Sequence, residues 1–98
     1  EKSRYYYRKK RLKREYKITP EQYDAMLKKQ SGKCLICDKA ETLKSWHNQE
    51  VMRLSVDHNH DTGVIRGLLC NHCNKGLGHF RDKSELLLNA FLYLEDFV

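Results

Sequence analysis

Helical periodicity and β-type runs alternate along the chain and divide it into predicted elements. Thr19, Pro20 and Gln22 have the order of an N-cap, a first helical residue and a capping-box partner. Apolar positions then return every three or four residues, which is the spacing of one helical face. We therefore predict a helix that ends at Ser31 and Gly32.

The middle of the chain has the pattern of a β-hairpin. Residues 54–58 and 64–69 are β-prone runs, and the spacer between them, residues 59–63, is rich in turn formers. Gly63 is the spacer residue expected to adopt a positive φ. The sequence thus predicts two short antiparallel strands joined by a tight connection.

The last segment is predicted to form a helix that closes the core. Its apolar residues share one stripe, and Asp82 with Glu85 resembles a capping box at its start. The stripe consists of Leu87, Phe91, Leu94 and Val98. Residues 38–53 show little periodicity, so we expect a surface loop there, with Trp46 folded back on the core.

A chain of 98 residues forms one domain with a small core, and domains of this size often need a metal or disulfide to hold them together. Four cysteines form two C-x-x-C pairs, in which two thiolates of one tight turn can meet the same ion. The pairs are Cys34 with Cys37 and Cys70 with Cys73. Structural zinc is the favoured interpretation, and a disulfide pair or two redox motifs are the alternatives.

The net charge of +6 is concentrated at the start of the chain. Residues 1–17 carry nine Lys or Arg and two Glu, together with four Tyr, whereas the remaining residues have a net charge of −1. Basic residues interleaved with aromatic ones suit a nucleic-acid backbone, although such a run can also be a solvated tail. The segment has no broad apolar stripe, so we expect it to order fully only on nucleic acid.

The hairpin also carries the densest group of reactive side chains. Asp57, His58 and His60 lie in one short stretch, and Asn74 follows the last cysteine at the opening of a helix. An Asp-His pair alone can simply satisfy a turn. A metal ion that clamps the helix against the hairpin, however, would let Asp57, His58 and Asn74 converge.

Four segments together resemble the recombination endonuclease VII family, a branch of the HNH or ββα-metal nucleases. They are ITPEQYDAML, GKCLIC, LSVDHNHDTGVIRGLLCNHCNKGLG and the Leu-rich closing helix. The resemblance covers nearly everything after residue 15 and implies an α+β fold, a small zinc-braced ββα-metal domain with flanking helices. It also implies a metal-dependent DNA endonuclease that leaves 5′-phosphate and 3′-hydroxyl ends, encoded by a phage or bacterium.

The same resemblance assigns roles to individual residues. Cys34, Cys37, Cys70 and Cys73 match structural Zn²⁺ ligands. Asp57 and Asn74 match ligands of a catalytic Mg²⁺ or Mn²⁺, and His58 matches the general base. Asn74 stands where many HNH enzymes carry a second His, which makes this an HNN-like variant. His60 and Arg66 are auxiliary candidates. His60 can orient the base or serve only as a hydrogen-bond partner within its turn. Arg66 can clamp a phosphate or serve only as a cross-strand partner.

We therefore expect residues 1–17 to be a basic, helical DNA-contacting arm and residues 18–98 to be the nuclease domain. The residues expected to contact DNA are Arg4, Arg8, Lys9, Lys10, Arg11, Lys13 and Arg14. The alternatives are a noncatalytic zinc module that binds nucleic acid and a protein-interaction zinc domain. Branched, duplex and site-specific substrates all remain open, as does a homodimer, which would supply two active sites.

No apolar run is long enough to cross a bilayer, and no signal-peptide pattern is present. We therefore expect an intracellular, cytoplasmic protein without a membrane partner.

Overall fold

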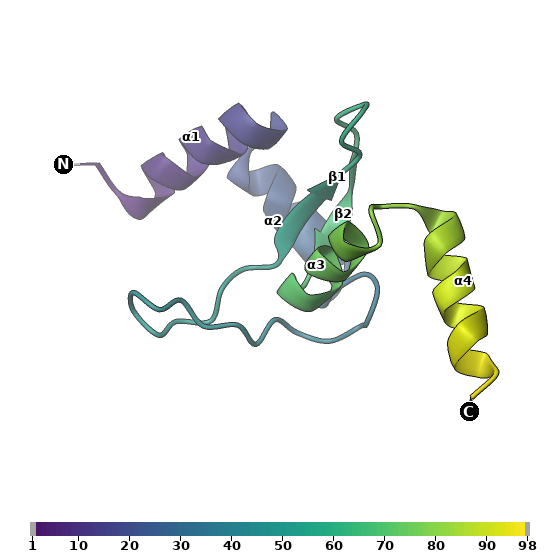
Figure 1. Cartoon of the computed structure of the whole chain (residues 1–98). Helices are drawn as coiled ribbons and strands as arrows, with labels where there is room; N and C mark the ends of the chain where they lie inside the picture. Colours follow the sequence, from purple (N-terminus) through teal and green to yellow (C-terminus); the bar gives the residue numbers. More distant parts are fainter. Residues whose placement is uncertain (1, 98) are drawn as a thin grey trace.

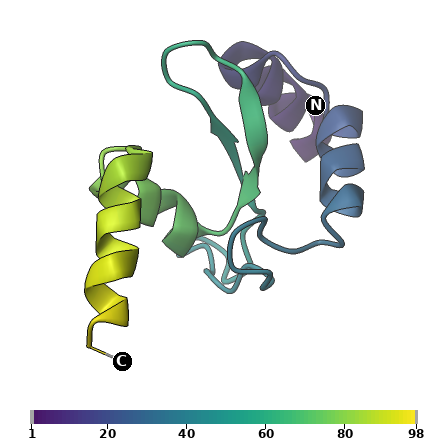
Figure 2. The ribbon, with the colours of Figure 1, turned by 90° about the vertical axis from the view of Figure 1, so that its right-hand side faces the viewer.

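The β-hairpin lies between two pairs of helices in the computed structural model, which describes residues 2–97 (Figures 1 and 2). Within that range the chain forms four helices and one two-stranded antiparallel sheet, so the predicted small α+β architecture is confirmed. The elements are α1 (Arg4–Tyr16), α2 (Pro20–Lys29), β1 (Ser55–His58), β2 (Ile65–Leu69), α3 (Asn71–His79) and α4 (Ser84–Glu95). Helices α1 and α2 lie on one side of the hairpin, and α3 and α4 lie on the other (Figure 2).

Helix α2 begins as its sequence predicts and carries the hairpin on its buried face. Thr19 and Gln22 form a reciprocal capping box, with Pro20 in the first turn. The Tyr23 hydroxyl donates to the Leu54 carbonyl at 2.5 Å. The Gln30 amide pairs with both backbone groups of Leu68, donating at 2.9 Å and accepting at 3.0 Å. These bonds fix both strands relative to α2.

The hairpin turn forms from the residues that the sequence indicates. The Asn59 side chain accepts from the backbone N–H groups of Asp61 and Thr62, at 2.8 and 3.0 Å. Gly63 has a φ of +78°, as predicted, and its N–H donates to the Asn59 carbonyl. A β-bulge separates Asp57 from His58, where the pairing changes register. The bulge lies at the two residues that carry the predicted chemistry.

The buried apolar core is small and includes two of the cysteines. Its residues are Leu12, Tyr23, Cys34, Leu54, Val56, Leu68, Leu69 and Cys70. Leu12 lies in the middle of α1 and is 3% exposed, and Tyr16 packs against the same cluster. Helix α1 has no broad apolar stripe, as the sequence indicates, but one buried leucine and one half-buried tyrosine seat it on the body.

Helix α4 differs from its prediction. None of its described residues is buried, and Leu88, Phe91 and Leu94 are exposed, so α4 does not close the core. The predicted capping box is also wrong, because Lys83 is the N-cap residue and no side chain caps the helix. Val98, the last residue of the predicted stripe, lies outside the described residues. No described helix combines the length and the apolar character needed to cross a membrane.

The loop of residues 38–53 folds as an irregular hairpin of its own. Lys44 pairs with Val51, and the Ser45 N–H donates to the Glu50 carbonyl at 2.8 Å. Trp46 at its tip is 81% exposed, so the expectation that it folds back on the core is wrong. Glu41 ties the loop to the body by accepting from the Asn71 N–H at 2.8 Å, at the start of α3.

Candidate functional site

The four cysteines converge on one point between the hairpin and α3. All four Sγ atoms lie within 4.8 Å of one another, and the Sγ atoms of Cys37 and Cys70 are 3.8 Å apart. A tetrahedral zinc ion with Zn–S bonds of about 2.3 Å places its ligand sulfurs about 3.8 Å apart. The donor set and its spacing therefore fit a closed zinc site, and the prediction that these cysteines are positioned for a metal is confirmed.

The electrostatics of the cluster also call for a cation. Burial and the neighbouring sulfurs raise the pKa of Cys73 to about 12. Burial acts in the same direction at Cys34, but backbone N–H donors outweigh it and lower the pKa of that thiol to about 6. The Cys34 thiolate thus forms readily, whereas the Cys73 thiol beside it resists ionisation. Four thiolates in this volume need a positive ion at their centre.

The cysteine cluster joins elements that are far apart in the sequence. The Leu35 N–H donates to the Leu68 carbonyl at 3.2 Å, which attaches the first cysteine turn to β2. A Cβ on Gly67 would lie 2.7 Å from Cδ2 of Leu35, so a larger residue there would require the exposed Leu35 side chain to move. Cys70 is the N-cap of α3, and its Sγ accepts from the Cys73 N–H. The cluster therefore sets the position of α3 against the hairpin.

Asp57 is the most buried charged residue of the hairpin, at 8% exposed, and it is paired. Arg66 on β2 donates to both of its oxygens, at 2.7 and 3.0 Å. The same guanidinium donates to both oxygens of Asp82, at 3.0 and 2.8 Å. Both carboxylates raise the pKa of Arg66, and Arg66 lowers the pKa of Asp82. The three side chains form one ion-paired network beside a cavity of about 290 Å³.

His58 points to the other side of the hairpin. Its ring lies 5.6 Å from that of Tyr16 on α1 and 4.8 Å from that of His60, measured between centroids. Asp57 instead lies on the side of α3 and α4, where Arg66 bonds both to it and to Asp82. Consecutive strand residues face opposite sides of a sheet, which accounts for the separation.

Asn74 lies on α3, directly after the cysteine turn, and is half-buried. Among the residues 2–97, no hydrogen bond or ion pair joins its side chain to Asp57 or His58. The structure therefore brings Asp57 together with Arg66 and His58 together with His60, but it does not bring the three predicted catalytic side chains into direct contact. The donor chemistry of a carboxylate and an amide oxygen still suits a hard divalent ion.

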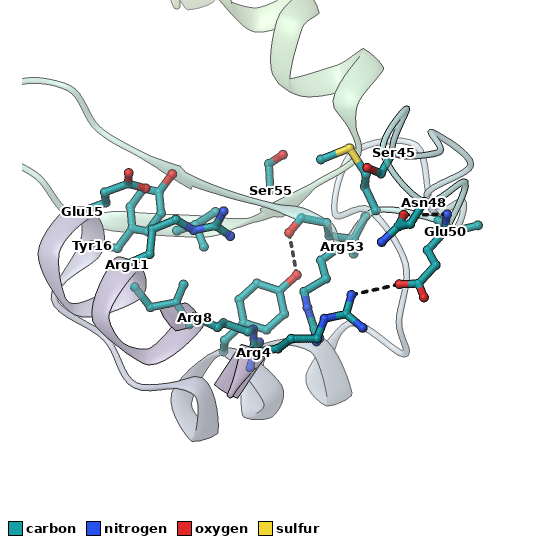
Figure 3. Close-up of a pocket in the computed structure, with 16 residues that line it drawn as sticks. Arg4, Arg8, Arg11, Glu15, Tyr16, Ser45, Asn48, Glu50, Arg53 and Ser55 are labelled. Carbon is teal, nitrogen blue, oxygen red and sulfur yellow. Dashed lines mark hydrogen bonds and ion pairs between the residues drawn. The ribbon is translucent and has the colours of Figure 1, made fainter. Parts of the chain in front are cut away.

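A second feature lies on the α1 side, where a cavity of about 620 Å³ separates α1 from the loop of residues 38–53 (Figure 3). Arg4, Arg8 and Arg11 line it from α1, and Arg53 lines it just before β1. Three of the predicted DNA-contacting residues thus share one concave surface. The other four, Lys9, Lys10, Lys13 and Arg14, are exposed elsewhere on α1.

Sequence reasoning missed three residues of these sites. Asp82 was taken for a cap residue, although its φ of +56° places it in the turn before α4, where it meets Arg66. Arg53 gave no periodic signal. Glu41 accepts three backbone N–H groups, which lower its pKa although burial raises it. A lone acidic residue in an irregular loop offers no pattern that would have revealed this.

The sequence of this chain is similar to a known protein family and to two phage proteins. A sequence profile described as recombination endonuclease VII matches residues 9–96. The Gene 59 protein of Mycobacterium phage D29 is 49% identical over 80 residues, which is 81% of this chain and 44% of that protein. The Gene 59 protein of Mycobacterium phage L5 is 45% identical over 80 residues, with the same two shares. The chain spans less than half the length of these curated relatives.

Proposed function

The chain belongs to the recombination endonuclease VII family, and from this membership we propose that it is a metal-dependent DNA endonuclease of the HNH type. The observation that carries the proposal is the family match over residues 9–96, which includes both cysteine pairs and the Asp57–His58 strand. In this proposal residues 1–17 are the DNA-contacting arm and residues 18–98 are the nuclease domain. The cysteine cluster holds zinc for folding, because a closed four-sulfur shell leaves no position for substrate.

Hydrolysis of a phosphodiester needs a base for the attacking water and neutralisation of charge on the leaving oxygen. His58 in its neutral form takes the proton from the water, and His60 beside it orients the imidazole. A Mg²⁺ or Mn²⁺ ion bound by Asp57 and Asn74 would stabilise the developing 3′ oxygen. The attacking and leaving oxygens lie on opposite sides of phosphorus, so His58 and an ion held by Asp57 would have to approach one phosphate from two sides.

Arg66 gives this mechanism an additional requirement. Both Asp57 oxygens accept from Arg66, so a metal ion at Asp57 would compete with the guanidinium for the carboxylate. A substrate phosphate offers Arg66 another bidentate partner. We propose that Arg66 moves from Asp57 to the phosphate when DNA binds and thereby clamps the substrate.

A cleavage assay tests the proposed function. Linear, nicked and four-way-junction DNA are each incubated with the protein in Mg²⁺, in Mn²⁺ and in chelator, and the product ends are identified. We expect metal-dependent cleavage that leaves 5′-phosphate and 3′-hydroxyl ends. DNA binding without cleavage under every condition would instead support a noncatalytic zinc module. This is the second candidate function, and it is favoured by the pairing of both Asp57 oxygens with Arg66.

We expect Asp57→Asn to raise the Mg²⁺ concentration needed for half-maximal cleavage, because an amide replaces the one charged ligand. Asp82→Asn is the matched control, since it changes the other carboxylate on the same guanidinium without touching a proposed metal ligand. The measurement is a Mg²⁺ titration of the cleavage rate. A Mg²⁺ requirement that rises equally in both variants would mean that Asp57 acts only by positioning Arg66.

We expect the exposed basic residues of α1 to contribute a large part of the salt dependence of DNA binding. Deleting residues 1–17 would also remove Leu12 from the core. We therefore substitute glutamine at four exposed positions, Lys9, Lys10, Lys13 and Arg14. Each lost phosphate contact lowers the slope of log affinity against log salt by about 0.9, so the slope should fall by up to about 3.6.

The matched control for this charge change lies outside α1. Glutamine at Lys28, Lys29, Lys33 and Lys39 removes the same charge from exposed positions on α2 and the loops after it. Equal slopes for the two quadruple variants would show that binding responds to net charge alone and that α1 is a solvated tail.

A homodimer is part of the same proposal. Leu88, Phe91 and Leu94 expose an apolar face on α4, and a second copy that covers it would bring two active sites onto one DNA molecule. Sedimentation velocity decides between this dimer and a monomer.

A further inference from the structure

Trp46 is the one tryptophan of the chain, and its side chain has no place in the core. It lies at the tip of the loop hairpin, 81% exposed, with its ring 3.9 Å from that of His47 and tilted by 30°. Backbone bonds between Ser45 and both Gln49 and Glu50, each at 2.8 Å, hold the tip in shape. The loop thus presents a large aromatic face to solvent from a defined turn.

The tip forms one wall of the arginine-lined cavity. Ser45 and Asn48, on either side of the Trp46–His47 stack, line the cavity opposite α1 (Figure 3). Arg4, Arg8 and Arg11 are spaced so that they share one face of α1. Arg4 and Arg11 are roughly 10 Å apart along the helix axis, so the three arginines can contact more than one phosphate of a strand.

Part of the positive charge in this cavity is unneutralised. Arg4 pairs with Glu50 at 3.1 Å and Arg8 lies 3.6 Å from Asp24, but within residues 2–97 neither Arg11 nor Arg53 has an ion-pair partner. Over the same described range, Arg8 Nη2, the atom that faces Asp24, is buried without a hydrogen-bond acceptor. A phosphate bound in the cavity would balance the guanidinium groups of Arg11 and Arg53.

We propose that the cavity and the loop tip form a binding site for an unpaired segment of DNA. The arginines hold successive phosphates, and Trp46, backed by His47, stacks on an exposed base. Base stacking on aromatic side chains requires a free base face, which a continuous duplex does not offer. The inference rests on the proposed function only in taking DNA as the ligand, and it assigns a site separate from Asp57, His58 and Asn74.

The position of Trp46 makes the test direct, because all tryptophan emission comes from this residue. The full chain, loaded with zinc, is titrated with a short oligothymidylate and with a blunt duplex, and a dye on each DNA reports binding independently. We expect the oligothymidylate to quench the emission and to protect Trp46 from acrylamide, whereas the duplex binds without either effect.

Two substitutions probe the two parts of the site. Trp46→Ala should weaken oligothymidylate binding roughly 5- to 100-fold, the range expected for loss of one stacked base, and should affect the duplex much less. Arg53→Gln should weaken oligothymidylate binding several-fold, whereas Arg81→Gln, an exposed arginine beyond α3, should not. Zinc content and a thermal melt verify that each variant is folded.

The outcomes separate this inference from the proposed function. If the parent cleaves DNA but its emission is unchanged when the oligothymidylate is bound, the unpaired-strand site is wrong and the endonuclease assignment stands. Equal quenching by the duplex would also overturn the site. If the oligothymidylate binds with quenching but no DNA is cleaved under any metal condition, the site stands and the endonuclease assignment fails.

Discussion

Replacing Cys70 by serine is expected to release the zinc ion and to unfold most of the domain. Cys70 belongs both to the metal shell and to the buried core, and it is the N-cap of α3. Structural zinc sites contribute about 10–16 kcal/mol in small zinc-binding peptides, whereas a whole domain is stable by about 5–15 kcal/mol. A core of eight buried residues cannot replace a loss of that size.

The comparison uses His72→Ser as a matched control, because His72 lies in the same turn, is exposed and is not a member of the cysteine cluster. Metal analysis should give one zinc per chain in the parent and in the control, and much less in Cys70→Ser. Circular dichroism melts should show a cooperative transition only in the first two. A Cys70→Ser variant that melts with the parent would rule out a structural role for the metal.

The correct sequence predictions depend on residues that are close together in the chain. The capping box of Thr19 and Gln22 spans one helical turn, and the positive φ of Gly63 belongs to a single tight turn. Each cysteine pair likewise lies within four consecutive residues. Because neighbouring residues determine these features, no knowledge of the tertiary structure was needed to predict them.

The incorrect predictions concern what covers a side chain. The periodicity of α4 indicates an apolar face correctly but cannot say whether the same chain buries it, and the structure leaves Leu88 and Phe91 exposed. Trp46 was expected to fold back on the core because the chain has few other large apolar side chains. Leu12, by contrast, is the one leucine of α1, so it formed no stripe, yet it lies in the core.

The candidate catalytic site shows the same limit. The sequence placed Asp57 and His58 at the end of one strand, and β1 does contain both. It could not show that Arg66 and Asp82 occupy the carboxylate, because that network joins β2 to the turn before α4. Tertiary packing decides which partner Asp57 takes. In the proposed mechanism, that partner determines when the carboxylate is available to a metal.

His58→Ala is expected to lower the cleavage rate by about 10²- to 10⁴-fold, the usual contribution of a general base, while DNA affinity stays close to that of the parent. His58 is half-buried, and its ring lies near those of Tyr16 and His60, so its removal should cost the fold little. Single-turnover cleavage at saturating Mg²⁺ measures the chemical step, and His79→Ala, at the end of α3, is the control histidine.

A lost base can be told apart from a disturbed site by chemical rescue. Imidazole added to the buffer can accept the proton of the attacking water at the space left by the missing ring, so it should restore part of the activity of His58→Ala and leave the parent unchanged. A variant impaired because Tyr16 and α1 have shifted would bind DNA more weakly and would not respond to imidazole. Cleavage by His58→Ala at the parent rate would show that another group activates the water, and His60, whose ring lies 4.8 Å away, would then be the residue to substitute next.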